Sequence, residues 1–124
     1  MGLMANSGAS RAAKFTSLRG GSDPHEEALI AQRAREIANS PEGRGDVDNW
    51  LRAEREVVTD LLAAEYAKSY RPGQSGVENL YRDEARRWVL TAQRARAIAN
   101  SPENRGDGEN WLRAERELRA QGVI

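Results

Sequence analysis

Cysteine is absent from the 124-residue sequence, which also has only one histidine and one phenylalanine. Without cysteine there are no disulfides, thiolate metal ligands or cysteine nucleophiles. No apolar run approaches the roughly 20 residues that span a bilayer, so we expect no membrane association. Residues 1–22 lack the apolar segment of a secretory signal. These absences favour a protein of the reducing cytoplasm.

Net charge is also absent, because 19 Lys and Arg residues balance 19 Asp and Glu residues. The charges are unevenly spread: residues 1–22 carry +3, residues 23–70 carry −5 and residues 71–124 carry +2. A domain that binds nucleic acid usually has a clear excess of basic residues. The charge balance therefore disfavours nucleic acid as a partner.

The sequence does contain one stretch that is present twice. Residues 31–57 and residues 92–118 align without a gap at an offset of 61 positions, and 22 of the 27 pairs are identical. The identity ends abruptly on the N-terminal side, where residues 26–30 and 87–91 share only one leucine. Such self-similarity indicates two copies of one structural unit.

Each copy has the pattern of two helices joined by a short turn. Before the first copy, Asp23 and Pro24 are typical of a helix start. Pro41 disfavours helical geometry in the residue before it, so this helix is expected to end near Asn39. Between these ends, apolar residues recur at steps of three and four, as in an amphipathic helix.

Three further helices follow from the same rules. The second is expected to begin at Asp46, which caps it, and to run to about residue 70. Residues 75–78 form a capping box that opens a long third helix. Asp107 is expected to cap the fourth helix, which ends at Gly122.

The two turns differ at one position, which is Gly43 in the first copy and Asn104 in the second. Glycine and asparagine are the residues that most readily adopt positive φ. The exchange therefore predicts a left-handed residue at this position of each turn.

These patterns predict an all-α fold. One hairpin of this size offers few large apolar residues, so we expect two hairpins to bury their apolar faces together. The predicted architecture is a four-helix arrangement with pseudo-two-fold symmetry. It consists of a disordered basic tail over residues 1–22, hairpin unit 1 over 23–71 and hairpin unit 2 over 72–124. The sequence leaves open whether the chain is a monomer or a homodimer.

Each turn is followed by a tryptophan, Trp50 or Trp111. Either the ring closes its hairpin by packing on the preceding helix, or it offers a platform to a ligand. The first is favoured, because a small hairpin needs a large apolar group.

Arg44 and Arg105 lie inside the turns. They either brace the turns or bind phosphate at the N-terminus of the next helix. His25 has no histidine counterpart in the second copy, and we expect no metal or catalytic role for it.

Charged residues around each tryptophan lie four positions apart, which favours ion pairs along a solvated helix face. They are Asp48, Arg52 and Glu56 in the first copy and Glu109, Arg113 and Glu117 in the second. Ion pairing along this face accounts for the charged residues, so no catalytic or binding role is assigned to them.

Several repeated residues are not fully explained by local structure. We predict that they form an interaction surface that is presented twice: Gln32, Asn39, Arg44, Arg55, Gln93, Asn100, Arg105 and Arg116. No catalytic, metal-binding or cofactor-binding residue is predicted, because the sequence has no P-loop, dinucleotide fingerprint or zinc-ligand spacing.

Two segments of the repeat resemble a known family. The sequences PEGR at residues 41–44 and WLRAE at residues 50–54 recur in the second copy, with Asn104 as the one exception. They are similar to motifs of the bacterial family called domain of unknown function 2934. The histidine usual before the family's tryptophan is Asn49 or Asn110 here. The resemblance implies small helical hairpins and implies no reaction.

The function predicted from the sequence is that of a non-catalytic interaction or structural module with an unidentified protein partner. Two alternatives stay open. A nucleic-acid-binding protein would use the basic tail and the arginines of the second unit, namely Arg82, Arg86, Arg87, Arg94 and Arg96. A small-ligand binder or an enzyme would use the tryptophans and arginines at the two turns.

Overall fold

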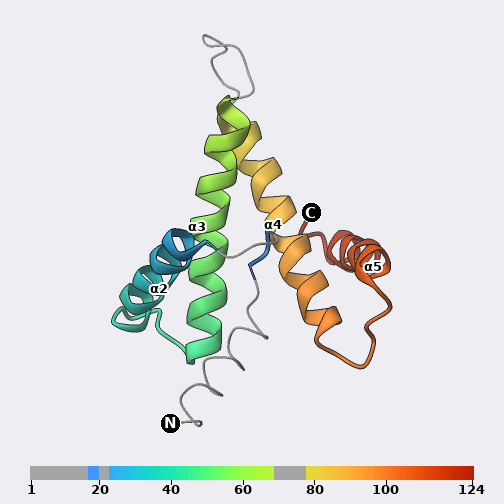
Figure 1. Ribbon diagram of the computed structural model, residues 1–124, viewed down its shortest axis with the longest axis horizontal. Helices are drawn as coiled ribbons and strands as arrows, with labels where there is room; N and C mark the ends of the chain where they lie inside the picture. Colours follow the sequence, from blue (N-terminus) through green and yellow to red (C-terminus); the bar gives the residue numbers. More distant parts are fainter. Residues whose placement is uncertain (1–16, 20–22, 69–77) are drawn as a thin grey trace.

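The computed structural model describes residues 17–19, 23–68 and 78–124. This part of the chain forms four helices in sequence: α2 (Pro24–Ala38), α3 (Asp46–Lys68), α4 (Glu78–Ala99) and α5 (Asp107–Ala120). Consecutive helices run in opposite directions (Figure 1), and the described residues contain no strand. The predicted all-α fold of helical hairpins is therefore confirmed. The predicted capping box at residues 75–78 lies largely outside the described residues.

The outer helix ends are where the sequence predicts them. The Asp23 side chain caps α2 by accepting hydrogen bonds from the backbone N–H groups of His25 and Glu26, and Asn39 is the C-cap. At the other end of the chain, Gly122 adopts a φ of 73° just after α5. A left-handed glycine at this position lets the following N–H groups bond to the last helical carbonyls.

The turns differ from the prediction in two respects. Neither Gly43 nor Asn104 is left-handed; in the second turn the positive φ belongs to Gly106, at 98°. Gly43 is needed for space instead, because a Cβ there would lie 2.7 Å from the carbonyl oxygen of Ala38. Asp107 does not cap α5 either, since Gly106 is the N-cap and no side chain bonds there. The predicted left-handed position and this predicted cap are therefore wrong.

One apolar core joins α2, α3 and α4. Trp50 packs against it, as expected of a ring that closes its hairpin. The second hairpin is closed differently: Trp111 lies against Trp88, with ring centroids 5.7 Å apart. In the first hairpin, the position equivalent to Trp88 is a glutamate, Glu27, which lies just before the repeated stretch. The buried core residues are Ile30, Ile37, Ala53, Val58, Leu62, Ala85 and Val89.

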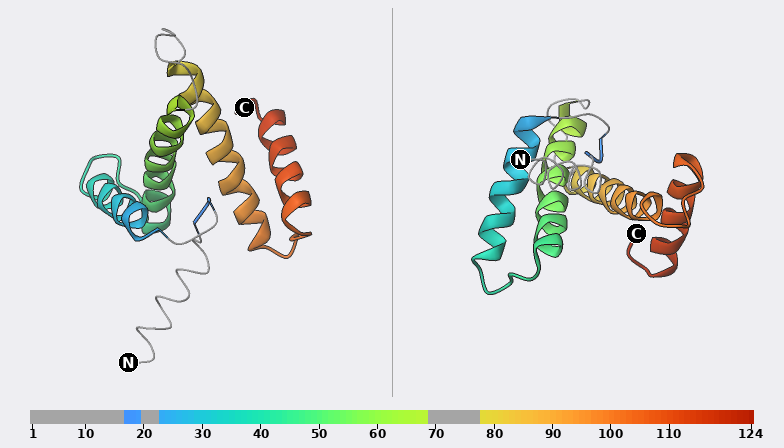
Figure 2. Two further views of the ribbon diagram at one scale, coloured as in Figure 1. Left: turned by 45° about the horizontal axis from the view of Figure 1, so that its top comes forward. Right: turned by 60° about the horizontal axis from the view of Figure 1, so that its bottom comes forward.

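The two hairpins are arranged head-to-tail. Contacts join α2 to α3, α3 to α4 and α4 to α5, and no other pair of described helices is in contact. Helices α3 and α4 therefore stand in the middle, with α2 and α5 on the outer sides (Figures 1 and 2). A two-fold axis between the hairpins would turn the α3–α4 contact into an α5–α2 contact, which the described helices lack.

The head-to-tail order has a physical cause. Helix α3 continues beyond the repeat to Lys68, and its extension carries buried Val58 and Leu62. Helix α4 begins before the second copy and carries buried Ala85 and Val89. Apolar surface outside the repeat therefore pairs α3 with α4, whereas α5 ends soon after the repeat does.

Residues 17–19 belong to the predicted disordered tail but contact the helices. Leu18 packs against the core, and the Arg19 guanidinium pairs with Glu26 at 2.7 Å and Glu65 at 2.6 Å. The hydrogen bond from Arg19 to Glu26 raises the pKa of the arginine. Two carboxylates on separate helices thus hold this part of the tail. Residues 1–16 and 20–22 lie outside the described part of the chain.

Candidate interaction site

A buried asparagine holds each turn of the repeat. The Asn49 side chain accepts a hydrogen bond from the Arg44 backbone N–H at 2.8 Å and donates one to the Arg44 carbonyl at 2.9 Å. Asn110 accepts from the Arg105 backbone N–H at 3.0 Å and donates to the Asn104 side chain at 2.9 Å. The turns are therefore braced through the main chain of the arginines. The recurrence of asparagine just before each tryptophan was the available signal for this role.

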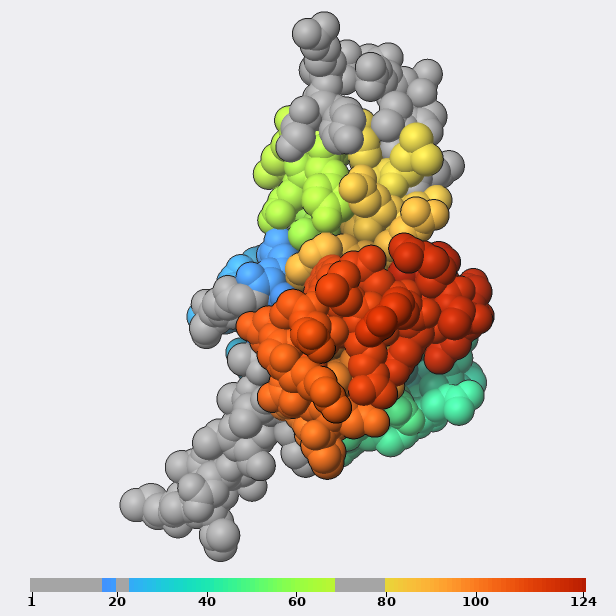
Figure 3. Space-filling view, turned by 90° about the vertical axis from the view of Figure 1, so that its right-hand side faces the viewer, coloured from blue at the N-terminus to red at the C-terminus, as the bar shows by residue number. Residues whose placement is uncertain are grey.

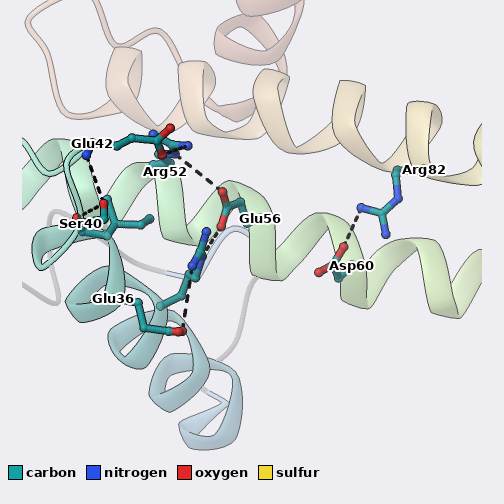
Figure 4. Close-up of polar contacts among 9 residues, drawn as sticks. Glu36, Ser40, Glu42, Arg52, Glu56, Asp60 and Arg82 are labelled. Atoms are coloured by element: carbon teal, nitrogen blue, oxygen red, sulfur yellow. Dashed lines mark hydrogen bonds and ion pairs between the residues drawn. The ribbon is translucent and has the colours of Figure 1, made fainter.

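A chain of ion pairs ties the first hairpin together (Figure 4). Glu56 on α3 accepts a hydrogen bond from Arg33 on α2 at 2.5 Å and pairs with Arg52 at 3.7 Å. Arg52 then reaches Glu42 in the turn at 2.7 Å. The Arg33 hydrogen bond is the main cause that lowers the pKa of Glu56. Of the predicted series, the i,i+4 pair of Arg52 and Glu56 is present, whereas Asp48 forms no ion pair with a described residue. Arg33 and Glu42 extend the ion pairs across the hairpin instead.

The second hairpin repeats this chain at equivalent positions. Glu117 pairs with Arg94 at 2.5 Å and with Arg113 at 3.2 Å, and Arg113 reaches Glu103 at 3.0 Å. The pKa of Glu117 is lowered chiefly by the hydrogen bond from Arg94. Repeated charges at these positions therefore serve the hairpin itself.

An arginine-rich hollow of about 800 Å³ opens between α2, α3 and α4. Two of its arginines, Arg55 and Arg86, form no ion pair with another described residue, and both are exposed. The hollow has five arginines and only two carboxylates, so it carries excess positive charge. Its lining residues are Arg33, Arg52, Arg55, Glu56, Thr59, Asp60, Arg82, Arg86 and Leu90.

A smaller hollow of about 250 Å³ lies at the second turn. It includes Arg116, the counterpart of Arg55, together with Arg105. Its third arginine is Arg113, and two carboxylates, Glu103 and Glu109, share its wall, so its charge is more balanced. Neither repeat tryptophan lines either of these two hollows, which leaves the predicted tryptophan–arginine ligand site without support from them.

The structure separates the predicted interaction residues. Gln93 does not offer a free surface, because its amide donates to the Leu51 carbonyl at 2.9 Å and to the Glu54 carboxylate at 2.8 Å. The sequence alone does not reveal this structural role of Gln93, since its partners lie on another helix. The remaining members are exposed: Gln32, Asn39, Arg44, Arg55, Asn100, Arg105 and Arg116. Arg55 lines the larger hollow, and Arg105 and Arg116 line the smaller one.

The arginines proposed for nucleic acid binding are largely occupied by carboxylates. Arg82 pairs with Asp60 at 2.7 Å, Arg94 pairs with Glu117, and Arg96 pairs with buried Glu54 at 2.6 Å. These pairs reduce the charge that the second unit presents to a phosphate backbone. The result weakens, within the described residues, the alternative of nucleic acid binding by this arginine set.

Within residues 17–19, 23–68 and 78–124, no group of three His, Asp or Glu side chains is placed to hold a metal ion. His25 is exposed in the first turn of α2. None of the described helices is long and apolar enough to cross a membrane.

Comparison of the chain with protein families, curated proteins and solved structures finds no match. The resemblance to the domain of unknown function 2934 family therefore stays a prediction. The hairpins observed here are of the kind that this resemblance implies.

Proposed function

We propose that this chain is a non-catalytic interaction module of the cytoplasm that binds an acidic segment of a partner protein. The arginine-rich hollow between α2, α3 and α4 is the observation that carries the proposal. Guanidinium groups bind carboxylates through paired hydrogen bonds with defined geometry. Arg55 and Arg86 face this hollow without a carboxylate partner among the described residues.

The position of the hollow supports a protein partner. Three helices contribute to it, so a bound segment would contact both hairpins at once. The ion pairs of Arg33 and Arg52 hold the α2 and α3 side of the hollow in place. Because these guanidiniums are already fixed, less conformational entropy is lost when a ligand binds beside them.

The proposal predicts that removing the two unpaired arginines weakens binding of an acidic peptide. The probe is a fluorescein-labelled oligoglutamate peptide, titrated with the protein and followed by fluorescence anisotropy. We expect the Arg55→Ala/Arg86→Ala variant to bind at least about tenfold more weakly, because each charge-assisted hydrogen bond contributes about 1.5–3 kcal/mol. The matched control, Lys68→Ala/Arg87→Ala, removes the same charge from exposed positions outside the hollow.

The control separates a site from general attraction. Equal weakening in both variants would mean that the peptide responds only to net charge, and the proposal would fail. A DNA duplex that binds more tightly than the peptide, and depends on Arg55 and Arg86, would favour nucleic acid instead. Circular dichroism melts of both variants verify that the fold is intact.

A further inference from the structure

The contact between the two hairpins uses polar side chains that lie inside the repeat. On α4, Gln93 donates to the Leu51 carbonyl and to Glu54, while Arg96 binds both oxygens of Glu54 at 2.6 and 2.8 Å. The pair is well buried, since 3% of the Glu54 side chain and 11% of the Arg96 side chain are exposed. A buried, bidentate pair of this kind fixes the orientation of one helix on another.

The repeat carries a second set of the same four residues. At the offset of 61 positions, Gln93 and Arg96 correspond to Gln32 and Arg35, and Leu51 and Glu54 correspond to Leu112 and Glu115. Each of the four pairs is identical. Gln32 and Arg35 lie on α2, and Leu112 and Glu115 lie on α5.

Among the described residues, this second set makes none of the contacts that the first set makes between α3 and α4. Gln32 and Arg35 are exposed, and Arg35 forms no ion pair with a described residue. Leu112 is 60% exposed, and the one ion pair of Glu115 with a described residue is a long pair with Arg119 at 3.8 Å. Helices α2 and α5 do not touch each other and lie on opposite sides of the molecule (Figure 1). Figure 3 looks onto α5 and shows that no other helix covers its outer face.

We infer that a second copy of this chain binds here, with its α2 on the α5 of the first copy. The contact repeats the internal α3–α4 contact: Arg35 and Gln32 of one molecule bind Glu115 of the other, and Gln32 also reaches the Leu112 carbonyl. The faces are complementary in charge, one offering a guanidinium and the other a carboxylate. Because the contact joins different faces, it is heterologous and builds closed rings or open chains.

Small residues on α2 allow the same close approach. Ala28 and Ala31 take the positions of Val89 and Ala92, which are buried on α4. On the other face, Arg119 takes the position of buried Val58. The contact between molecules is therefore less apolar than the internal one, and we expect reversible, concentration-dependent association. This inference does not rest on the arginine-rich hollow or on the proposed function.

Sedimentation velocity of the full chain over a wide range of concentration tests the contact. Arg35→Glu and Glu115→Arg each place like charges against one another, so each variant alone should sediment near the monomer mass of 13.8 kDa. An equimolar mixture of the two should associate again, because a contact between the two variants joins either both altered faces or both unaltered faces, and each such combination pairs opposite charges. The double variant Arg35→Glu/Glu115→Arg should also associate.

The controls carry the same charge changes on exposed positions of α4. Arg87→Glu and Asp83→Arg should associate as the unaltered chain does. The inference is overturned if the unaltered chain stays monomeric up to its highest soluble concentration, if the variants associate normally, or if mixing restores nothing. Oligoglutamate binding, measured separately, is expected to survive in Arg35→Glu, so failure of one proposal is distinguishable from failure of the other.

Discussion

Asn49 and Asn110 show how one side chain determines a turn. A primary amide has an acceptor and donors on the same group, so Asn49 satisfies both the N–H and the carbonyl of Arg44. Asn110 uses the same acceptor toward Arg105 but donates to the Asn104 side chain. Asn104 thus takes part in a turn whose first copy has a glycine, Gly43, held close to backbone carbonyls.

Replacement of Asn49 by alanine should destabilise the protein by about 2 kcal/mol, because two hydrogen bonds are lost in a buried place. Asn49→Asp should also destabilise, since a carboxylate cannot donate to the Arg44 carbonyl. The measurement is urea unfolding followed by circular dichroism. Asn39→Ala, at an exposed asparagine, is the control and should change stability by less than about 0.5 kcal/mol. Equal effects at both positions would contradict the role assigned to Asn49.

At the scale of elements, each hairpin combines an apolar seam with one chain of ion pairs. In the first hairpin the chain crosses from α2 to α3 through Arg33 and Glu56. The same link in the second hairpin joins α4 to α5 through Arg94 and Glu117. Partly exposed pairs contribute little individually, yet these pairs lie at the same positions in both copies. They therefore help to fix the register of the two helices in each hairpin.

The pair between Arg33 and Glu56 should make stability depend on pH. Because the folded pKa of Glu56 is lowered, its contribution is fully present above its ordinary value of about 4.5 and is lost as the pH falls through the folded value. Glu56→Gln should therefore be less stable than the unaltered chain near neutral pH, and the difference should shrink in acid. Urea unfolding at a series of pH values measures this difference.

Glu27→Gln is the control for that experiment, because Glu27 is an exposed glutamate outside the ion-pair chain. Its difference from the unaltered chain should not follow the pattern seen at Glu56. A Glu56→Gln difference that stays constant, or that grows in acid, would rule out the proposed link.

At the scale of the whole molecule, the α3–α4 contact holds the two hairpins in one body. Apolar residues outside the repeat and the buried pair of Glu54 and Arg96 both lie in this contact. Loss of one partner from a buried pair leaves a charge without compensation, which costs far more than loss of an exposed pair. The stability of the head-to-tail arrangement therefore depends strongly on one arginine.

Arg96→Met should lower the free energy of unfolding by about 3 kcal/mol, because Glu54 is left buried without its cation. The matched control is Arg35→Met, which makes the same change at the equivalent, exposed position of the first copy. Both are measured by urea unfolding at a low protein concentration, where association does not contribute. Similar losses in the two variants would contradict the asymmetric use of the repeat.

Much of the local structure was predictable, because caps, breakers and periodicity act through neighbours in sequence. Helix ends were predicted correctly from Asp23, Pro41 and Gly122, and the tryptophans indicated that the hairpins are closed. The left-handed residue was predicted at the wrong position. Residue 43 is a glycine because the Ala38 carbonyl leaves no room for a Cβ, and only the folded turn creates this crowding. The arginine-rich hollow was not predicted as a unit, since its walls come from three helices.

The sequence by itself determined that two like copies form two like hairpins, because most repeated residues meet equivalent local partners within each copy. Only the tertiary structure decided that Gln93 and Arg96 are used inside the molecule while Gln32 and Arg35 face outward. The physical reason is connectivity: the chain places α3 beside α4 and leaves α2 and α5 at the two outer sides. Identical side chains then have different neighbours, and burial and pairing follow from the neighbours.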